Sequence, residues 1–145
     1  MGIIPKFYIG KFKLSLAFNI NLIRSVDHNI GNKLITQQRL KWSEAKHIIN
    51  NLSGTDLTEI NIDQAGSIGG TTGDAAADVV IVNGTNGNDI IDIFGSGTSV
   101  AVLGLSTRVN ITNSEGANDS LVINALAGND GVTATTMPAG VIKLT

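Results

Sequence analysis

The sequence predicts an all-β fold, and three observations support this prediction. Glycine is abundant, at 17 of 145 residues, whereas aromatic residues make up only 4%, a composition that suits short strands and many turns. Short β-branched runs alternate with Gly- and Asn-rich turns. Similar segments recur 41 residues apart within residues 49–145. Together these features favour a β-solenoid, of the parallel β-helix or β-roll kind, over the alternative of a β-sandwich built from the same strands.

Charge divides the chain into two segments. Residues 1–47 hold eight Lys and Arg residues against Asp27 and Glu44, a net charge of +6. Residues 48–145 hold Arg108 and Lys143 against ten acidic residues, a net charge of −8. So abrupt a change is typical of a boundary between segments of different role. We therefore expect a basic N-terminal appendage over residues 1–47 and an acidic β-repeat module over residues 48–145.

A strand and a helix are expected in and just beyond the basic segment. Apolar residues alternate with polar or small ones over residues 12–22, which is the period-2 pattern of an amphipathic strand. Residues 36–52 have helical character, and Gly54 is placed to end such a helix. The residues at helical spacing are Trp42, Ala45, Ile49 and Leu52. This helix conflicts with the repeat described next, which requires a strand at Ile49.

Three eight-residue segments share one pattern: Ile or Val, Asn, three variable residues, Gly, one variable residue and Asp. They are residues 49–56, 82–89 and 123–130. The second and third copies lie 41 residues apart, and at that offset Asp78 aligns with Asp119, Val100 with Val141 and Leu103 with Leu144. A shorter echo links residues 60–62 to residues 109–111. A sustained offset of this kind predicts stacked repeats.

Strands within the module are expected at residues 79–82, 90–93, 100–103 and 108–112, because each is β-branched or alternates with period 2. The Asn-Gly pairs at residues 83–84 and 86–87 suit tight turns. A last strand is expected at residues 141–145, with no polar cap after it. We therefore expect an open strand edge that favours association, and we interpret the module as a fragment or as a unit normally continued by more chain.

One segment resembles a calcium-binding motif. Residues 84–92 follow the nonapeptide Gly-Gly-x-Gly-x-Asp-x-U-x, in which U is a large apolar residue, and residues 125–133 retain part of it. The matched positions are Gly84, Gly87, Asp89 and Ile91 in the first copy and Gly128, Asp130 and Val132 in the second. In such a motif glycines allow tight turns, the Asp supplies an anionic oxygen and the apolar residue packs inward. With these residues the chain resembles the hemolysin-type calcium-binding (RTX) family of bacterial proteins.

The resemblance covers about residues 49–145 and is closest to the β-repeat region that flanks the nonapeptide array in some members. It implies type I export, folding outside the cell and calcium loading of a downstream array. It also makes Gly84, Gly87, Asp89, Gly128 and Asp130 candidates for a calcium site. The sequence departs from the family because no second nonapeptide follows either copy. If the 41-residue units stack, Asp89 and Asp130 would lie near each other. The alternative is ordinary turn chemistry with hydrogen-bonded side-chain ladders.

Nothing in the sequence predicts catalysis. The glycine-rich residues 66–73 lack the Lys of a phosphate-binding loop, and His28 and His47 are flanked by neither Cys nor a carboxylate cluster. The chain has no Cys, no apolar run long enough to cross a membrane and no recognised nucleic-acid motif. We expect a non-enzymatic structural β-repeat module of an extracellular RTX-like calcium-binding bacterial protein. Its expected partners are calcium ions and continuing RTX-like chain or other β-edges. The alternatives are a calcium-independent adhesion or spacer module and a truncated product without function.

Overall fold

Strands make up all the regular structure that this computed structural model describes, which covers residues 16–19, 33–37, 44–67 and 69–145. The expectation of an all-β fold is therefore confirmed for this part of the chain. The strands are β1 (Leu16–Asn19), β2 (Lys33–Gln37), β3 (Ala45–Ile49), β4 (Glu59–Asp63), β5 (Val79–Asn83), β6 (Ile90–Ser96), β7 (Ser99–Leu103), β8 (Arg108–Thr112), β9 (Ser120–Asn124), β10 (Gly131–Thr136) and β11 (Lys143–Leu144). No helix that could span a membrane occurs among these residues.

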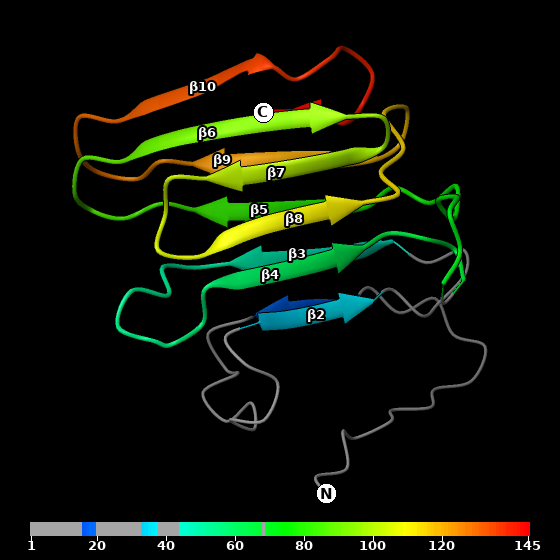
Figure 1. Cartoon of the computed structure of the whole chain (residues 1–145), viewed down its shortest axis with the longest axis horizontal. Helices are drawn as coiled ribbons and strands as arrows, with labels where there is room; N and C mark the ends of the chain where they lie inside the picture. The colour runs from blue at the N-terminus through cyan, green and yellow to red at the C-terminus, as the bar shows by residue number, and fades with distance from the viewer. Residues whose placement is uncertain (1–15, 20–32, 38–43, 68) are drawn as a thin grey trace, which may run out of the picture.

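The strands form two sheets that face each other (Figure 1). The first sheet has the order β1-β3-β5-β9-β11, and all of its pairs are parallel. The second has the order β10-β6-β7-β8-β4-β2 and is parallel except at β6/β7 and β7/β8. From β1 to β6 and from β8 to β11 the chain crosses from one sheet to the other after every strand. Among the strands that the structure describes, only β6, β7 and β8 are consecutive within one sheet.

The core lies between the sheets and follows from period-2 patterning. In β4, β5 and β8 every second side chain is buried, and the residues between are half-buried or exposed. Inward-facing residues belong to one apolar cluster that includes Ile60, Ile62, Val80, Val82 and Ile111. Burying this β-branched face is the main source of stability for such short strands.

The 41-residue repeat sets the strand register where both copies cross between the sheets. β5 pairs with β9 from Val79↔Ser120 to Asn83↔Asn124, and β6 pairs with β10 from Ile90↔Gly131. The shorter echo is also confirmed, since β4 pairs with β8 from Ile60↔Val109 to Ile62↔Ile111.

Beyond β6, residues that the 41-residue offset aligns do not occupy equivalent places in the structure, so this part of the alignment is wrong. Val100 and Leu103 lie in β7 of the second sheet, whereas Leu144 lies in β11 of the first and Val141 lies two residues before that strand. The reason is that β7 turns back to pair antiparallel with β6, while the chain after β10 crosses directly to the first sheet.

The helix expected over residues 36–52 is wrong where the structure describes those residues. Residues 36–37 end β2, and Ala45–Ile49 form β3 between β1 and β5. His47 and Ile49 are both buried at 3% exposure, and Ile48 between them is half-buried. Pairing on both sides of β3 therefore outweighs the local helical spacing. Trp42 lies outside the described residues.

The strand expected over residues 12–22 is described only at Leu16–Asn19, as β1. β3 spans the position at which the net charge changes, and β1 and β2 extend the two sheets formed by the later strands. The division into an appendage of residues 1–47 and a module of residues 48–145 remains a prediction about the origin of the two segments.

Candidate functional site

The candidate site is the pair of stacked turns that lead from the first sheet to the second. Residues 84–89 join β5 to β6, and residues 125–130 join β9 to β10. Parallel pairing before and after each turn places the turns directly on one another. As expected for stacked units, Asp89 and Asp130 are neighbours: the backbone N–H of Asp89 donates to Oδ1 of Asp130 at 2.8 Å.

The Asp89 carboxylate holds its own turn together. Its Oδ2 accepts from the backbone N–H of Thr85 at 2.6 Å, and its Oδ1 accepts from the Thr85 hydroxyl at 2.9 Å. The side chain is buried, so its oxygens depend on these donors in place of water. Thr85 was not anticipated from the sequence. The signal that could have revealed it is its spacing of four residues before the Asp, which suits an Asp-capped turn.

At two of the predicted glycines, Gly84 and Gly128, neighbouring atoms lie too close to leave room for a side chain. A Cβ atom at Gly84 would lie 2.7 Å from Oδ2 of Asp89 and 2.8 Å from the carbonyl oxygen of Ala125. Gly128 has φ of +138°, and a Cβ there would lie 2.3 Å from the carbonyl oxygen of Gly87. Gly87 itself has room, since its nearest such contact is the Thr85 hydroxyl at 3.5 Å.

Asparagine side chains form a ladder beside the turns. Nδ2 of Asn124 donates to Oδ1 of Asn83 at 2.8 Å, and Nδ2 of Asn83 donates to Oδ1 of Asn50 at 2.7 Å. These are the Asn residues of the three aligned eight-residue segments. The repeated Asn therefore satisfies amide groups across three neighbouring strands. A second rung in the other sheet runs from Asn110 to Asn61 at 2.8 Å.

The opposite ends of the strands use carboxylates in the same way. Oδ1 of Asp119 accepts from the backbone N–H of Asp78 at 3.0 Å, and Oδ1 of Asp78 accepts from that of Ala45 at 2.7 Å. Burial raises the pKa of Asp119, opposed by backbone hydrogen bonds from Glu115 and Asp78. The sequence aligned Asp78 with Asp119 but did not suggest that they connect successive repeats.

The turn carboxylates are thus engaged by protein N–H and O–H groups. Calcium requires six to eight oxygen ligands, and within the described part of the chain no three His, Asp or Glu side chains are grouped to hold a metal ion. A cation at Asp89 would have to compete with the two hydrogen bonds from Thr85. As arranged, these residues fit a hydrogen-bonded turn better than an ion cage, and calcium binding by Gly84, Gly87, Asp89, Gly128 and Asp130 stays a prediction.

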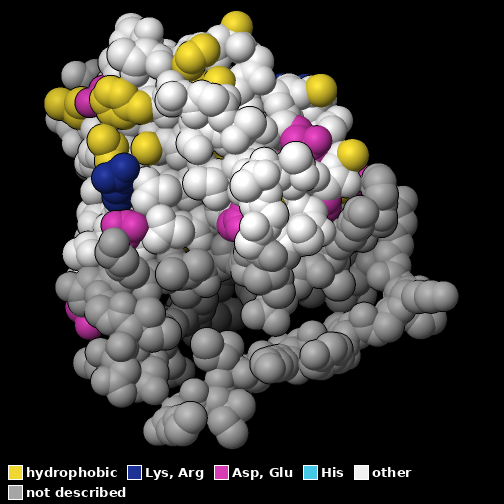
Figure 2. Space-filling view, turned by 45° about the vertical axis from the view of Figure 1, so that its right-hand side comes forward, with side chains coloured by type: hydrophobic (Ala, Val, Ile, Leu, Met, Phe, Trp, Pro, Cys, Tyr) yellow, Lys and Arg dark blue, Asp and Glu magenta, His cyan; other side chains and the backbone are white. Residues whose placement is uncertain are grey.

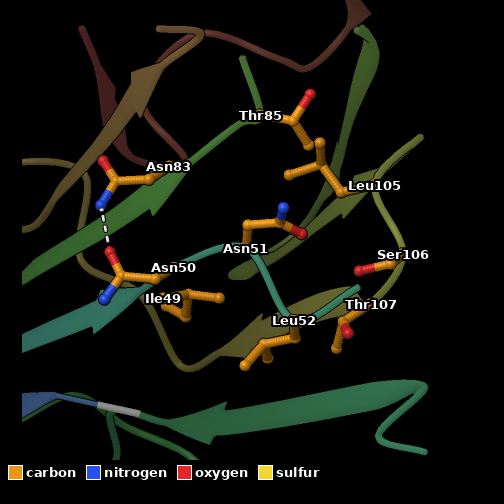
Figure 3. A pocket seen from close by; sticks show the side chains of 9 residues that line it. All are labelled: Ile49, Asn50, Asn51, Leu52, Asn83, Thr85, Leu105, Ser106 and Thr107. Atoms are coloured by element: carbon orange, nitrogen blue, oxygen red, sulfur yellow. Dashed lines mark hydrogen bonds between the residues drawn. The ribbon is translucent and has the colours of Figure 1, made fainter. Parts of the chain in front are cut away.

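A small hollow lies beside the turns (Figure 3). It is lined by Ile49, Asn50, Asn51, Leu52, Asn83, Thr85, Leu105, Ser106 and Thr107. Its volume is about 10 Å³, which suffices for about one water molecule. The hollow is therefore too small to receive an organic substrate. Comparison of the chain with protein-family models, curated proteins and solved structures finds no match.

Proposed function

We propose that this chain is a non-enzymatic structural module of an extracellular, RTX-like, calcium-binding bacterial protein, built as a short β-solenoid. The observation that carries the structural role is the stacking of two crossing units at an offset of 41 residues, tied together by Asn and Asp ladders. Such stacks extend a chain in one direction and need no ligand cleft. Export, calcium dependence and the bacterial origin rest on the sequence resemblance.

The first test is thermal unfolding of the whole chain, followed by far-UV circular dichroism, in a chelator and then in excess calcium. A ligand that binds only the folded state raises the melting temperature. The variant Asp130→Asn retains an oxygen that accepts from Asp89 but removes the charge that calcium needs. Glu44→Gln, at an exposed carboxylate away from the turns, is the matched control.

If calcium raises the melting temperature of the wild type and of Glu44→Gln but not of Asp130→Asn, calcium binds at the stacked turns. If the melting curves are the same in both buffers, the module does not bind calcium and that part of the proposal is overturned. An unfolded spectrum in both buffers would overturn the structural role as well.

A second candidate function is calcium-independent adhesion or spacing through strand edges. Within the described residues β10 pairs with β6 alone, and five of its six residues are exposed. Residues 131–142 carry no charge, whereas natural edge strands are usually protected by charges. The exposed large apolar residues are Ile90, Phe94, Leu126, Val132 and Leu144. Figure 2 shows apolar side chains gathered toward the upper end of the molecule, where β10 lies in Figure 1.

This candidate predicts association that depends on protein concentration and not on chelators. Sedimentation velocity of the wild type would be compared with Val132→Lys, at the edge, and with Thr98→Lys, in the exposed turn between β6 and β7. Association that Val132→Lys abolishes and Thr98→Lys retains would support adhesion through β10. A monomer at all concentrations would exclude self-association at this edge.

A further inference from the structure

Two Asn-Gly pairs lie three residues apart in the candidate turn, and their surroundings differ. Asn83 and Gly84 end β5 and begin the turn, whereas Asn86 and Gly87 form its tip. Asn-Gly is the sequence most prone to spontaneous cyclisation, because the missing Cβ lets the backbone nitrogen of Gly approach the side-chain amide of Asn. The structure therefore offers a comparison of identical chemistry in two environments.

Asn83 and Gly84 are held in place by three hydrogen bonds to neighbouring strands. Oδ1 of Asn83 accepts from Asn124, its Nδ2 donates to Asn50, and the Gly84 N–H donates to the carbonyl oxygen of Asn124 at 2.8 Å. Gly84 is also buried. Attack by the Gly84 nitrogen would require the loss of all three hydrogen bonds and the entry of water into the strand pair.

Asn86 and Gly87 are more exposed to solvent and are held by fewer hydrogen bonds than Asn83 and Gly84. Both residues are exposed, and the Gly87 N–H makes one hydrogen bond, to the Thr85 hydroxyl at 3.0 Å, which is itself exposed. Breaking one exposed hydrogen bond is easier than breaking three shared by neighbouring strands. Water reaches the tip of the turn without any movement of the strands.

We propose that Asn86 is a site of spontaneous deamidation and isoaspartate formation, whereas Asn83 is protected by the asparagine ladder. The Gly87 nitrogen attacks Cγ of Asn86 and loses its proton, and a new N–C bond forms. The Cγ–Nδ2 bond breaks and ammonia leaves, which yields a succinimide. Water then opens the ring at either carbonyl to give aspartate or isoaspartate, so the only co-reactant is water.

The consequence is a change of charge and backbone within the stacked turn. Either product adds a negative charge three residues from Asp89. Isoaspartate also adds a methylene group to the main chain next to Gly87, whose carbonyl oxygen lies under Gly128. A Cβ at Gly128 would lie 2.3 Å from that oxygen, so the two turns are in close contact at this point. A longer main chain at residue 86 is therefore expected to shift Gly87 and loosen the stacking of the two turns.

The test is peptide mapping by mass spectrometry of the whole native chain after prolonged incubation in mildly alkaline buffer made with ¹⁸O-labelled water. Label and loss of ammonia at Asn86 are expected to exceed those at Asn83 by on the order of tenfold or more. In denaturant the two sites should react at similar rates, because the ladder is absent. Equal rates at the two sites of the native chain, or faster reaction at Asn83, would overturn the proposal.

Two variants make the test specific. Gly87→Ala is compatible with the space around Gly87 and should strongly slow the reaction at Asn86. Asn124→Ala removes the donor to Asn83 and should speed reaction at Asn83 while leaving Asn86 unchanged. If Asn124→Ala leaves the rate at Asn83 as low as in the wild type, protection by the hydrogen bond from the Asn124 side chain is excluded. None of these outcomes depends on calcium or on export.

Discussion

The carboxylate of Asp130 accepts a hydrogen bond from the backbone N–H of Asp89, 41 residues earlier in the chain, at 2.8 Å. The same relation joins Asp119 to the N–H of Asp78, at the other end of the strands. In both cases an acidic residue that precedes a strand supplies an acceptor to the equivalent residue of the preceding repeat. Two of the acidic residues of the segment 48–145 therefore connect successive repeats.

Replacing Asp130 tests this connection. Asp130→Ala removes the acceptor of the Asp89 N–H and should lower the free energy of unfolding by about 1–2 kcal/mol. Asp130→Asn retains a side-chain oxygen and should cost less than half as much. Chemical denaturation in a chelator measures both. Equal losses for Ala and Asn would mean that the charge, and not the hydrogen bond, stabilises the turn.

Removing the central rung of the asparagine ladder should also destabilise the fold. Asn83→Ala leaves the amide of Asn124 and the oxygen of Asn50 without their partner, and we expect a loss of about 1–2 kcal/mol. The control is Asn86→Ala, at an exposed position three residues later, which should change stability by less than about 0.5 kcal/mol. Thermal or denaturant unfolding of the two variants provides the comparison. A similar effect at both positions would contradict the role of the ladder.

Gly128 should not tolerate a side chain. Gly128→Ala places a Cβ 2.3 Å from the backbone oxygen of Gly87 at a positive φ of +138°, and backbone cannot yield as a flexible side chain does. We expect a loss of about 2–4 kcal/mol or failure to fold. Gly131→Ala, in an open position with nothing within 4 Å, should remain close to wild type. Soluble yield and melting temperature distinguish the two.

Stability should depend on pH through His47. Burial lowers the pKa of His47 from 6.5 to about 4, so the unfolded chain binds a proton more readily than the folded one between these values. Stability should therefore fall as pH decreases from 6.5 to about 4, by about 3 kcal/mol in total. The raised pKa of Asp119 acts in the opposite direction, since its protonation favours the folded state at acidic pH.

His47→Leu isolates this effect. The variant should lose most of the decline in stability over that pH range, whereas Lys46→Met, at the exposed neighbour on β3, should retain it. Denaturant unfolding at a series of pH values measures the slope. A slope that is unchanged in His47→Leu would assign the pH dependence to other groups.

Local pattern was sufficient for much of the fold. β-branched runs marked β5 and β7, and alternation marked β8. The offset of 41 residues predicted the register of β5 against β9, because side chains that stack on one another are selected as equivalent pairs. The same offset brought Asp89 next to Asp130. Thr85, which holds the Asp89 carboxylate, lay within the motif, but nothing in the pattern indicated its contact.

Other features were beyond local pattern. Residues 45–49 have apolar positions that fit a helix and a strand alike, and only their position between β1 and β5 resolves this ambiguity. The sequence also could not show that the turn carboxylates accept hydrogen bonds from the protein, since Gly-x-Asp spacing occurs in ion-binding turns and in hydrogen-bonded turns alike. In this chain Thr85 and the neighbouring repeat supply the donors.

By itself the sequence determined the all-β class, the positions of most strands in the acidic segment and the pairing of equivalent residues in two repeats. These three features follow from side-chain alternation and from short-range turn chemistry, which depend on residues close together in the sequence. Tertiary structure alone decided that β6, β7 and β8 remain in one sheet and separate β4 from β10. The physical reason is that an edge strand accepts any partner that satisfies its hydrogen bonds and buries its apolar face. That choice is made by packing among distant segments, and no local pattern contains it.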